Sequence, residues 1–144
     1  MKYFASGLLF DNDGVLVDSH SASLVAWQLW ADEFAPTANW NDPANAGQRA
    51  EDLVRRWIAS PDIFEQANDR INQLEQDTAH QTVALAGAVD LLHSLTDGLW
   101  TVCTSANTNL GRARLEAAGL PVPSQLVTAN HVQRGKPHPD PYLL

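Results

Sequence analysis

Two carboxylates separated by one residue follow a short apolar run near the start of the chain. The run covers residues 7–10, and Asp11, Asp13 and Gly14 come directly after it. An apolar run that stops at polar turn residues is typical of a buried strand, so we expect both carboxylates at its carboxyl end, where open α/β sheets bind ligands. Carboxylates this close can share the coordination of a hard cation. The same residues also make a good turn, so this pattern alone leaves a purely structural role open.

Two later segments place polar residues in comparable positions. An apolar run over residues 99–104 predicts a second buried strand, and Ser105 follows it. Lys136 lies in a proline-rich segment near residue 140. Taken singly, Ser105 is typical of a strand-end cap and Lys136 of a solvated loop. Because both follow Asp11 and Asp13 along the chain, in comparable positions, we expect the four residues to contribute to one site.

The elements that must position these residues follow an alternating pattern. Helical spacing of apolar residues is present over 88–95 and 110–118, and 126–128 is a candidate short strand. Strands alternating with helices predict a parallel sheet with right-handed crossovers. Three helical patterns between residues 18 and 82 interrupt this alternation. We therefore expect an α/β core made of residues 1–17 and 83–144, with residues 18–82 inserted as a small helical cap.

Composition narrows the classes of protein that fit. The 144 residues are 44% hydrophobic, which is enough for a packed core, and the net charge of −8 argues against nucleic acid or an anionic membrane as a partner. The single cysteine excludes an internal disulfide and favours a reducing compartment. The N-terminal apolar run is too short for a signal peptide or a membrane span, so we expect a soluble cytoplasmic protein.

Aromatic and sulfur-containing residues receive structural interpretations. Four of the five tryptophans lie between Trp27 and Trp57, and we expect them to pack the small helices together rather than to stack on a ligand. Cys103 lies inside an apolar run, which predicts a buried, unreactive thiol. The five histidines show no metal-ligand spacing, so no transition metal is assigned.

Three segments in a fixed order resemble the motifs of a known superfamily. They are Phe10-Asp11-Asn12-Asp13-Gly14-Val15-Leu16-Val17-Asp18-Ser19, Val102-Cys103-Thr104-Ser105-Ala106-Asn107 and Gly135-Lys136-Pro137-His138-Pro139-Asp140. Together they resemble the haloacid dehalogenase superfamily of phosphatases, whose fold is a Rossmann-like α/β core with a parallel sheet. The likeness is strongest to sugar and polyol phosphatases with a small helical cap, a branch shared with β-phosphoglucomutase.

The resemblance implies a role for each motif residue. Asp11 corresponds to the nucleophile that forms an aspartyl-phosphate, and Asp13 to the acid and base that serves the leaving group and the water. The Asp11 side chain and the Asp13 backbone carbonyl correspond to Mg²⁺ ligands. The Ser105 hydroxyl and the Ala106 backbone N–H correspond to phosphate donors. Lys136 corresponds to the cation that holds the phosphate and Asp11 together.

Two further residues are weaker candidates for substrate binding. The segment over residues 46–53 resembles the specificity loop of related capped enzymes, and within it Arg49 would reach a sugar oxygen or a second phosphate. The competing interpretation is a surface arginine at a helix start. Asn109 is placed near the phosphate only by its spacing after Ser105. The resemblance implies a small phosphorylated metabolite, a sugar or polyol phosphate, as the partner, and a monomeric full-length protein.

The sequence also departs from the family pattern. The fourth motif, an acidic pair that completes the Mg²⁺ shell, is not found after Lys136, and we expect a C-terminally truncated sequence that binds Mg²⁺ weakly by itself. Ser23 stands where β-phosphoglucomutase carries a histidine in its cap, which favours hydrolysis over mutase chemistry. A phosphosugar mutase and a catalytically inactive fragment or binding module remain as alternatives.

Overall fold

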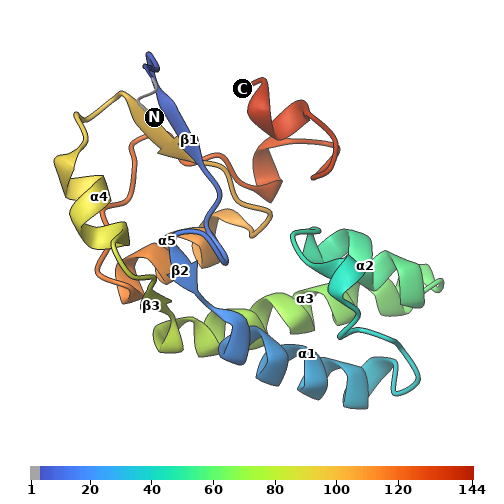
Figure 1. The fold of residues 1–144 in the computed structure, drawn as a ribbon. Helices are drawn as coiled ribbons and strands as arrows, with labels where there is room; N and C mark the ends of the chain where they lie inside the picture. Colours follow the sequence, from blue (N-terminus) through green and yellow to red (C-terminus); the bar gives the residue numbers. More distant parts are fainter. Residues whose placement is uncertain (1–3) are drawn as a thin grey trace.

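The computed structural model describes residues 4–144 and contains an α/β core beside a group of three helices (Figure 1). Strand β1 (Leu8–Phe10) pairs in parallel with β4 (Trp100–Val102), with Leu8 opposite Trp100 and Phe10 opposite Val102. A single parallel bridge between Cys103 and Val127 extends this pairing. Because the strands are parallel, the segments that follow β1 and β4 emerge at the same edge of the sheet.

Two helices of the core pack against this sheet. They are α4 (Ala88–Ser94) and α5 (Thr108–Ala117). The core cluster of buried side chains includes Val17, Leu92 and Leu115. Asn107 caps the N-terminus of α5, and its side chain accepts a hydrogen bond from the backbone N–H of Leu110 at 2.9 Å. Gly119 takes a left-handed conformation (φ 67°) just beyond its end, as a helix C-terminus of this kind requires.

The helical group has a hydrophobic cluster of its own. Helix α1 (His20–Phe34) leads away from the core, α2 (Ala50–Trp57) follows a loop, and α3 (Pro61–Thr78) returns along α1 (Figure 1). Trp30 is fully buried at its centre, and its indole N–H donates to the Ala67 carbonyl at 2.8 Å. The rings of Trp27 and Trp57 pack against Trp30. The expectation that the tryptophans pack the small helices together is therefore confirmed for these three. Trp27 also lines a cavity, so the expectation that it does not contact a ligand stays a prediction.

The two clusters support the division expected from the sequence. We propose that residues 18–82 form the cap and that residues 1–17 and 83–144 form the core. Residues 1–3 of that range lie outside the described residues. The helices α1, α2 and α3 of the cap are called the cap helices. A two-stranded antiparallel ribbon, β2 (Val17–Asp18) with β3 (Val83–Ala84), joins the two parts at both ends of the insert. Such short strands carry no readable periodicity, so the sequence did not predict them.

Short 3₁₀ turns complete the described chain. They are η1 (Pro43–Asn45), η2 (Ala79–Gln81), η3 (Ala129–His131) and η4 (Asp140–Tyr142). The last of these turns begins at Asp140, whose side chain pairs with Arg134 at 2.9 Å. No helix in residues 4–144 is long and apolar enough to cross a membrane.

Two expectations about strands are wrong. The candidate strand over residues 126–128 is reduced to the single bridge at Val127, because only two backbone hydrogen bonds join it to β4 and its extension. Strand β1 was expected to be buried, yet Leu8 is 39% and Leu9 44% exposed. The reason is that β4 is the one strand paired with β1 among residues 4–144.

Candidate active site

The loop after β1 is a tight turn built around one carbonyl. The backbone oxygen of Asn12 accepts hydrogen bonds from the N–H groups of Val15, Leu16 and Val17 at 2.8–3.2 Å. Gly14 has φ 78°, which residues with a side chain rarely adopt. The turn interpretation and the functional interpretation of this motif are thus compatible, because the turn presents Asp11 and Asp13 at the carboxyl end of β1.

Asp11 and Lys136 are in direct contact although 125 positions separate them. Lys136 Nζ donates to Asp11 Oδ1 at 2.7 Å and to the Cys103 carbonyl at 2.8 Å, and the lysine side chain is 11% exposed. The backbone N–H of Asn12 also donates to Asp11 Oδ1. Among the described residues no hydrogen bond reaches Oδ2. The carboxylate is therefore fixed through one oxygen, and the other is left to act on a ligand.

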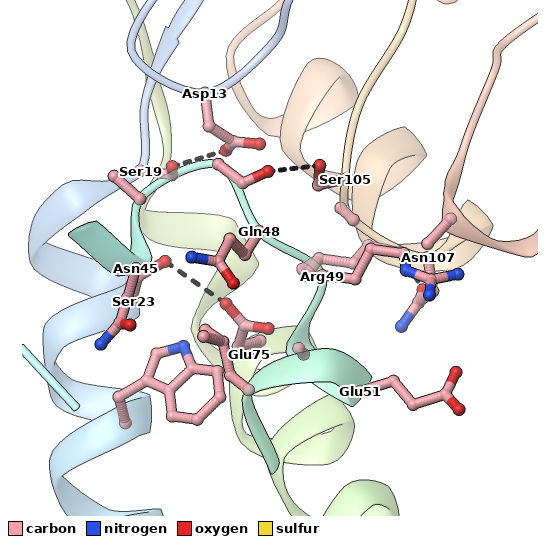
Figure 2. A pocket seen from close by; sticks show the side chains of 18 of the residues that line it. Asp13, Ser19, Ser23, Asn45, Gln48, Arg49, Glu51, Glu75, Ser105 and Asn107 are labelled. Carbon is pink, nitrogen blue, oxygen red and sulfur yellow. Dashed lines mark hydrogen bonds between the residues drawn. The ribbon is translucent and has the colours of Figure 1, made fainter. Parts of the chain in front are cut away.

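The Asp13 carboxylate is held by three side chains. Its Oδ1 accepts from the Ser19 hydroxyl at 2.6 Å (Figure 2) and from Arg114 at 3.0 Å. The Thr104 hydroxyl lies 3.4 Å from Oδ2. The two carboxylates thus have different partners: a lysine holds Asp11, whereas a serine and an arginine hold Asp13.

The residues expected to bind phosphate follow β4. The Ser105 hydroxyl donates to the Gly47 carbonyl at 2.6 Å, which brings the cap loop against this end of the sheet (Figure 2). The Ala106 N–H donates to the Thr104 hydroxyl at 3.1 Å. Cys103 is fully buried, and burial raises the pKa of its thiol, in agreement with the expected unreactive role.

A cavity of about 530 Å³ lies between the core and the cap helices. Four of the candidate residues line it: Asp13, Arg49, Ser105 and Ala106. Side-chain amides form much of the remaining wall, together with two indoles. These are Asn41, Asn45, Gln48, Asn68, Asn72, Asn107, Asn130, Trp27 and Trp40. Asp11 and Lys136 are not part of the cavity wall, and they connect to it through the turn that carries Asp13.

Asn109 is not brought to this cavity. It is exposed on the first turn of α5 and lines a separate groove with Asn72 and Gln73. The helix geometry explains this, because Asn107 turns inward as the N-cap while the residue two positions later faces outward. Asn107, at the start of α5, lines the cavity instead. Its side-chain amide donates to Asn72 Oδ1 at 2.9 Å.

Arg49 is neither a surface residue nor a free cation. Its side chain is 12% exposed and forms a two-point contact with Asp52 at 2.7 and 2.8 Å. The same guanidinium donates to the Val132 carbonyl of the core at 3.2 Å. Gly135 permits this approach, because a Cβ there would lie 2.7 Å from the Arg49 side chain. Arg49 therefore holds the cap loop against the segment that leads to Lys136.

The buried charges behind Asp13 were not predicted from the sequence. Arg114 of α5 is 6% exposed and contacts both Asp13 and Glu75, which belongs to cap helix α3 and is 9% exposed. Burial raises the pKa of the Glu75 carboxyl, and the nearby Arg114 opposes that change. A signal was present: Arg114 follows Leu110 by four positions, so it lies on the apolar face of its helix.

The donor set near Asp11 can be compared with what a Mg²⁺ ion would require. No group of three or more His, Cys, Asp or Glu side chains in residues 4–144 converges as metal ligands would. The unpartnered Asp11 Oδ2 suits a hard cation, whereas the Asp13 side chain is occupied by Ser19 and Arg114. A metal bound here would therefore use the Asp11 carboxylate, and Asp13 would contribute through its backbone.

Comparison with known proteins agrees with this geometry. Hexitol phosphatase A of Escherichia coli (strain K12) is 38% identical over 142 residues, which cover 96% of this chain and 66% of that protein. Glycerol-1-phosphate phosphohydrolase 2 of Saccharomyces cerevisiae is 30% identical over 148 residues, covering 94% and 56% respectively. The chain thus spans two thirds or less of the lengths of these relatives.

A solved structure and a family model also match nearly the whole chain. The crystal structure of a hydrolase from Pseudomonas syringae matches 96% of this chain and 68% of its own, with a TM-score of 0.79 and 29% identity. The model of the haloacid dehalogenase-like hydrolases matches residues 5–144. The chain therefore belongs to the haloacid dehalogenase-like hydrolase family.

Proposed function

We propose that the protein is a Mg²⁺-dependent phosphatase that hydrolyses small sugar or polyol phosphates through an aspartyl-phosphate on Asp11. One observation carries this proposal: Lys136 fixes Asp11 at the end of β1 while Asp13, two residues on, opens into a cavity lined by amides. The chain's likeness to a hexitol phosphatase and a glycerol-1-phosphate phosphohydrolase supports the substrate class.

The proposed chemistry divides hydrolysis into two phosphoryl transfers. Asp11 Oδ2 attacks phosphorus, the bond from phosphorus to the ester oxygen breaks, and Asp13 gives its proton to that oxygen. Asp13, now a carboxylate, takes a proton from water as the water oxygen attacks phosphorus. Phosphate leaves, and Asp11 returns to its starting carboxylate. Ser105, Ala106 and Lys136 hold the phosphoryl oxygens during both steps, which requires Ser105 and Ala106 to exchange their contacts with the Gly47 carbonyl and the Thr104 hydroxyl for the phosphoryl group.

A bound Mg²⁺ would supply charge neutralisation at the phosphoryl group. Asp11 and the backbone of Asp13 are the ligands that this chain offers. Lys136 adds the one cation in direct contact with Asp11 among the described residues. These groups together reduce the repulsion between a phosphate dianion and a carboxylate nucleophile.

The cavity favours an uncharged, hydroxyl-bearing alcohol as the leaving group. Amide side chains both donate and accept hydrogen bonds, as sugar hydroxyls do. Two arginines line the cavity, but Arg49 is paired with Asp52, and Arg114 with Asp13 and Glu75. A second phosphate would have to compete with these carboxylates. A volume of about 530 Å³ is within the usual range of small-ligand sites.

A mutase is less well supported. Ser23 lines the cavity, accepts from Arg114 at 2.9 Å and lies 3.4 Å from Glu75, so it is a neutral hydrogen-bonding residue rather than an acid or base. An inactive binding module would not need Asp11 held by a lysine beside a second positioned carboxylate. The proposal also includes a cytoplasmic, monomeric full-length protein, on the grounds of its single cysteine and acidic composition.

The direct test is product analysis with the full-length protein and Mg²⁺. Hexitol phosphates and glycerol 1-phosphate should release inorganic phosphate and the free polyol. A hexose 1-phosphate distinguishes the alternatives, because a mutase would return the hexose 6-phosphate. Isomerisation without phosphate release would establish the mutase, and no turnover of any ester would favour the binding module.

Arg49→Ala should alter substrate preference more than chemistry. Loss of the contacts with Asp52 and Val132 frees the cap loop, so kcat/KM for polyol phosphates should fall about tenfold. A minimal ester such as methyl phosphate, which does not reach the cap, should change by less than about twofold. Arg55→Ala is the matched control, because Arg55 lies on α2, the helix that Arg49 directly precedes, and pairs with Glu51 while 62% exposed. A uniform loss on all esters would contradict a role in substrate selection.

A further inference from the structure

Arg114 joins the catalytic turn to both long cap helices from a buried position. One guanidinium nitrogen donates to Asp13 Oδ1 at 3.0 Å. The second terminal nitrogen donates to Glu75 of α3 at 3.0 Å and to the Ser23 hydroxyl of α1 at 2.9 Å. The Arg114 side chain is 6% exposed, and its Nε is buried without a hydrogen-bond partner among the described residues, so the guanidinium is held through its two terminal nitrogens.

The geometry of the contact fixes relative positions. A guanidinium is planar, and its donors point in set directions, so two carboxylates bound to its two ends cannot move independently. Glu75 is itself anchored, since the Ser23 hydroxyl lies 3.4 Å from it (Figure 2). The place of the Asp13 carboxylate therefore depends on where the cap helices sit.

We propose that Arg114 is a positioning residue for Asp13, and that Glu75 makes this positioning depend on the cap being seated on the core. The proposal rests on the proposed function, in which Asp13 moves the proton. Asp13 Oδ1 is held by Ser19 at 2.6 Å and by Arg114 at 3.0 Å, whereas Oδ2 has only the longer contact with the Thr104 hydroxyl at 3.4 Å among the described residues. Oδ2 is therefore the oxygen that exchanges the proton with the leaving group. Proton transfer needs hydrogen-bond distance between the two oxygens, and a carboxylate that rotates loses that alignment.

A purely structural ion pair is the competing explanation. Removing one partner of a buried pair leaves an uncompensated charge and destabilises the fold. Arg114→Met alone would then lose activity simply because less protein is folded. The double variant Arg114→Met/Glu75→Gln separates the two roles, because it removes both the cation and the buried carboxylate of the cap, while Asp13 remains without its arginine.

The experiment compares two esters in the full-length protein with Mg²⁺. An alkyl phosphate needs the proton from Asp13, whereas a nitrophenyl phosphate has a leaving group that departs without it. In Arg114→Met and in the double variant, kcat/KM should fall roughly 10- to 100-fold for the alkyl ester and less than about threefold for the aryl ester. Arg114→Lys should recover part of the alkyl activity. Arg112→Met is the control on the same helix, since Arg112 is 54% exposed.

Thermal unfolding of each variant provides the structural readout. The melting temperature should fall in Arg114→Met and recover in the double variant, while the ratio of alkyl to aryl kcat/KM stays low in both. A ratio that stays at the wild-type value, or that recovers together with the melting temperature, would overturn the positioning role. If the wild type hydrolyses neither ester, the proposed function fails and this assignment fails with it.

Discussion

Asp11→Asn should lose phosphatase activity by about three orders of magnitude or more, because an amide oxygen is too poor a nucleophile to form the phosphoenzyme. The substitution preserves side-chain size, and its amide oxygen can still accept from Lys136 and from the Asn12 N–H. The expected loss is therefore in the chemistry. The measurement is release of inorganic phosphate from a hexitol phosphate with saturating Mg²⁺.

Asp97→Asn is the control for this variant. Asp97 is exposed in a turn of the same core, followed by Gly98 with φ 81°, where asparagine is as suitable as aspartate. Its activity and melting temperature should match the wild type. Near-wild-type hydrolysis by Asp11→Asn, at the purity needed to exclude the native enzyme, would remove Asp11 from the role of nucleophile.

Asp13→Asn should reduce kcat/KM for alkyl phosphates by roughly 10²- to 10⁴-fold, the usual contribution of a positioned acid. An activated aryl phosphate should lose far less in kcat/KM, because that parameter reports the step in which the leaving group departs. Asparagine can still accept from Ser19 and Arg114 but cannot give up a proton, so the test isolates proton transfer from positioning.

The second half of the reaction gives an independent check on Asp13. If Asp13 also activates the water, kcat should fall for both esters, because hydrolysis of the phosphoenzyme is common to them. Stopped-flow traces with the aryl ester should then show a burst of phenolate followed by a slow steady state. Equal losses of kcat/KM on both esters would argue against an acid role.

Much of the site follows from the order of three motifs. Asp11 and Ser105 follow strands that the sequence predicts, and the parallel pairing of these strands brings their carboxyl ends to one edge. The contact between Lys136 and Asp11 was expected from the resemblance and is present at 2.7 Å. Helix bounds were also close to expectation, since the patterns over 88–95 and 110–118 correspond to α4 (Ala88–Ser94) and α5 (Thr108–Ala117).

The features that the sequence did not predict depend on how the helices pack against one another and against the core. The contact of Arg114 with Glu75 joins residues 39 positions apart on two helices, and no local pattern encodes their crossing. Arg49 was expected either at the surface or on a ligand, but its position is set by Asp52 and by the close approach to Gly135. The predicted position of Asn109 near the phosphate was wrong for a similar reason. Its spacing after Ser105 does not determine which side of α5 faces the cavity.

The most direct test of the central claim is to identify the phosphorylated residue. Asp13→Asn should form the phosphoenzyme from a nitrophenyl phosphate and hydrolyse it slowly, so the intermediate should accumulate. The sample is quenched in acid during the burst, digested and analysed by mass spectrometry. One phosphoryl group should be found on Asp11, and none in the double variant Asp11→Asn/Asp13→Asn. A burst of phenolate with an unmodified Asp11, or a phosphoryl group on another residue, would contradict the mechanism.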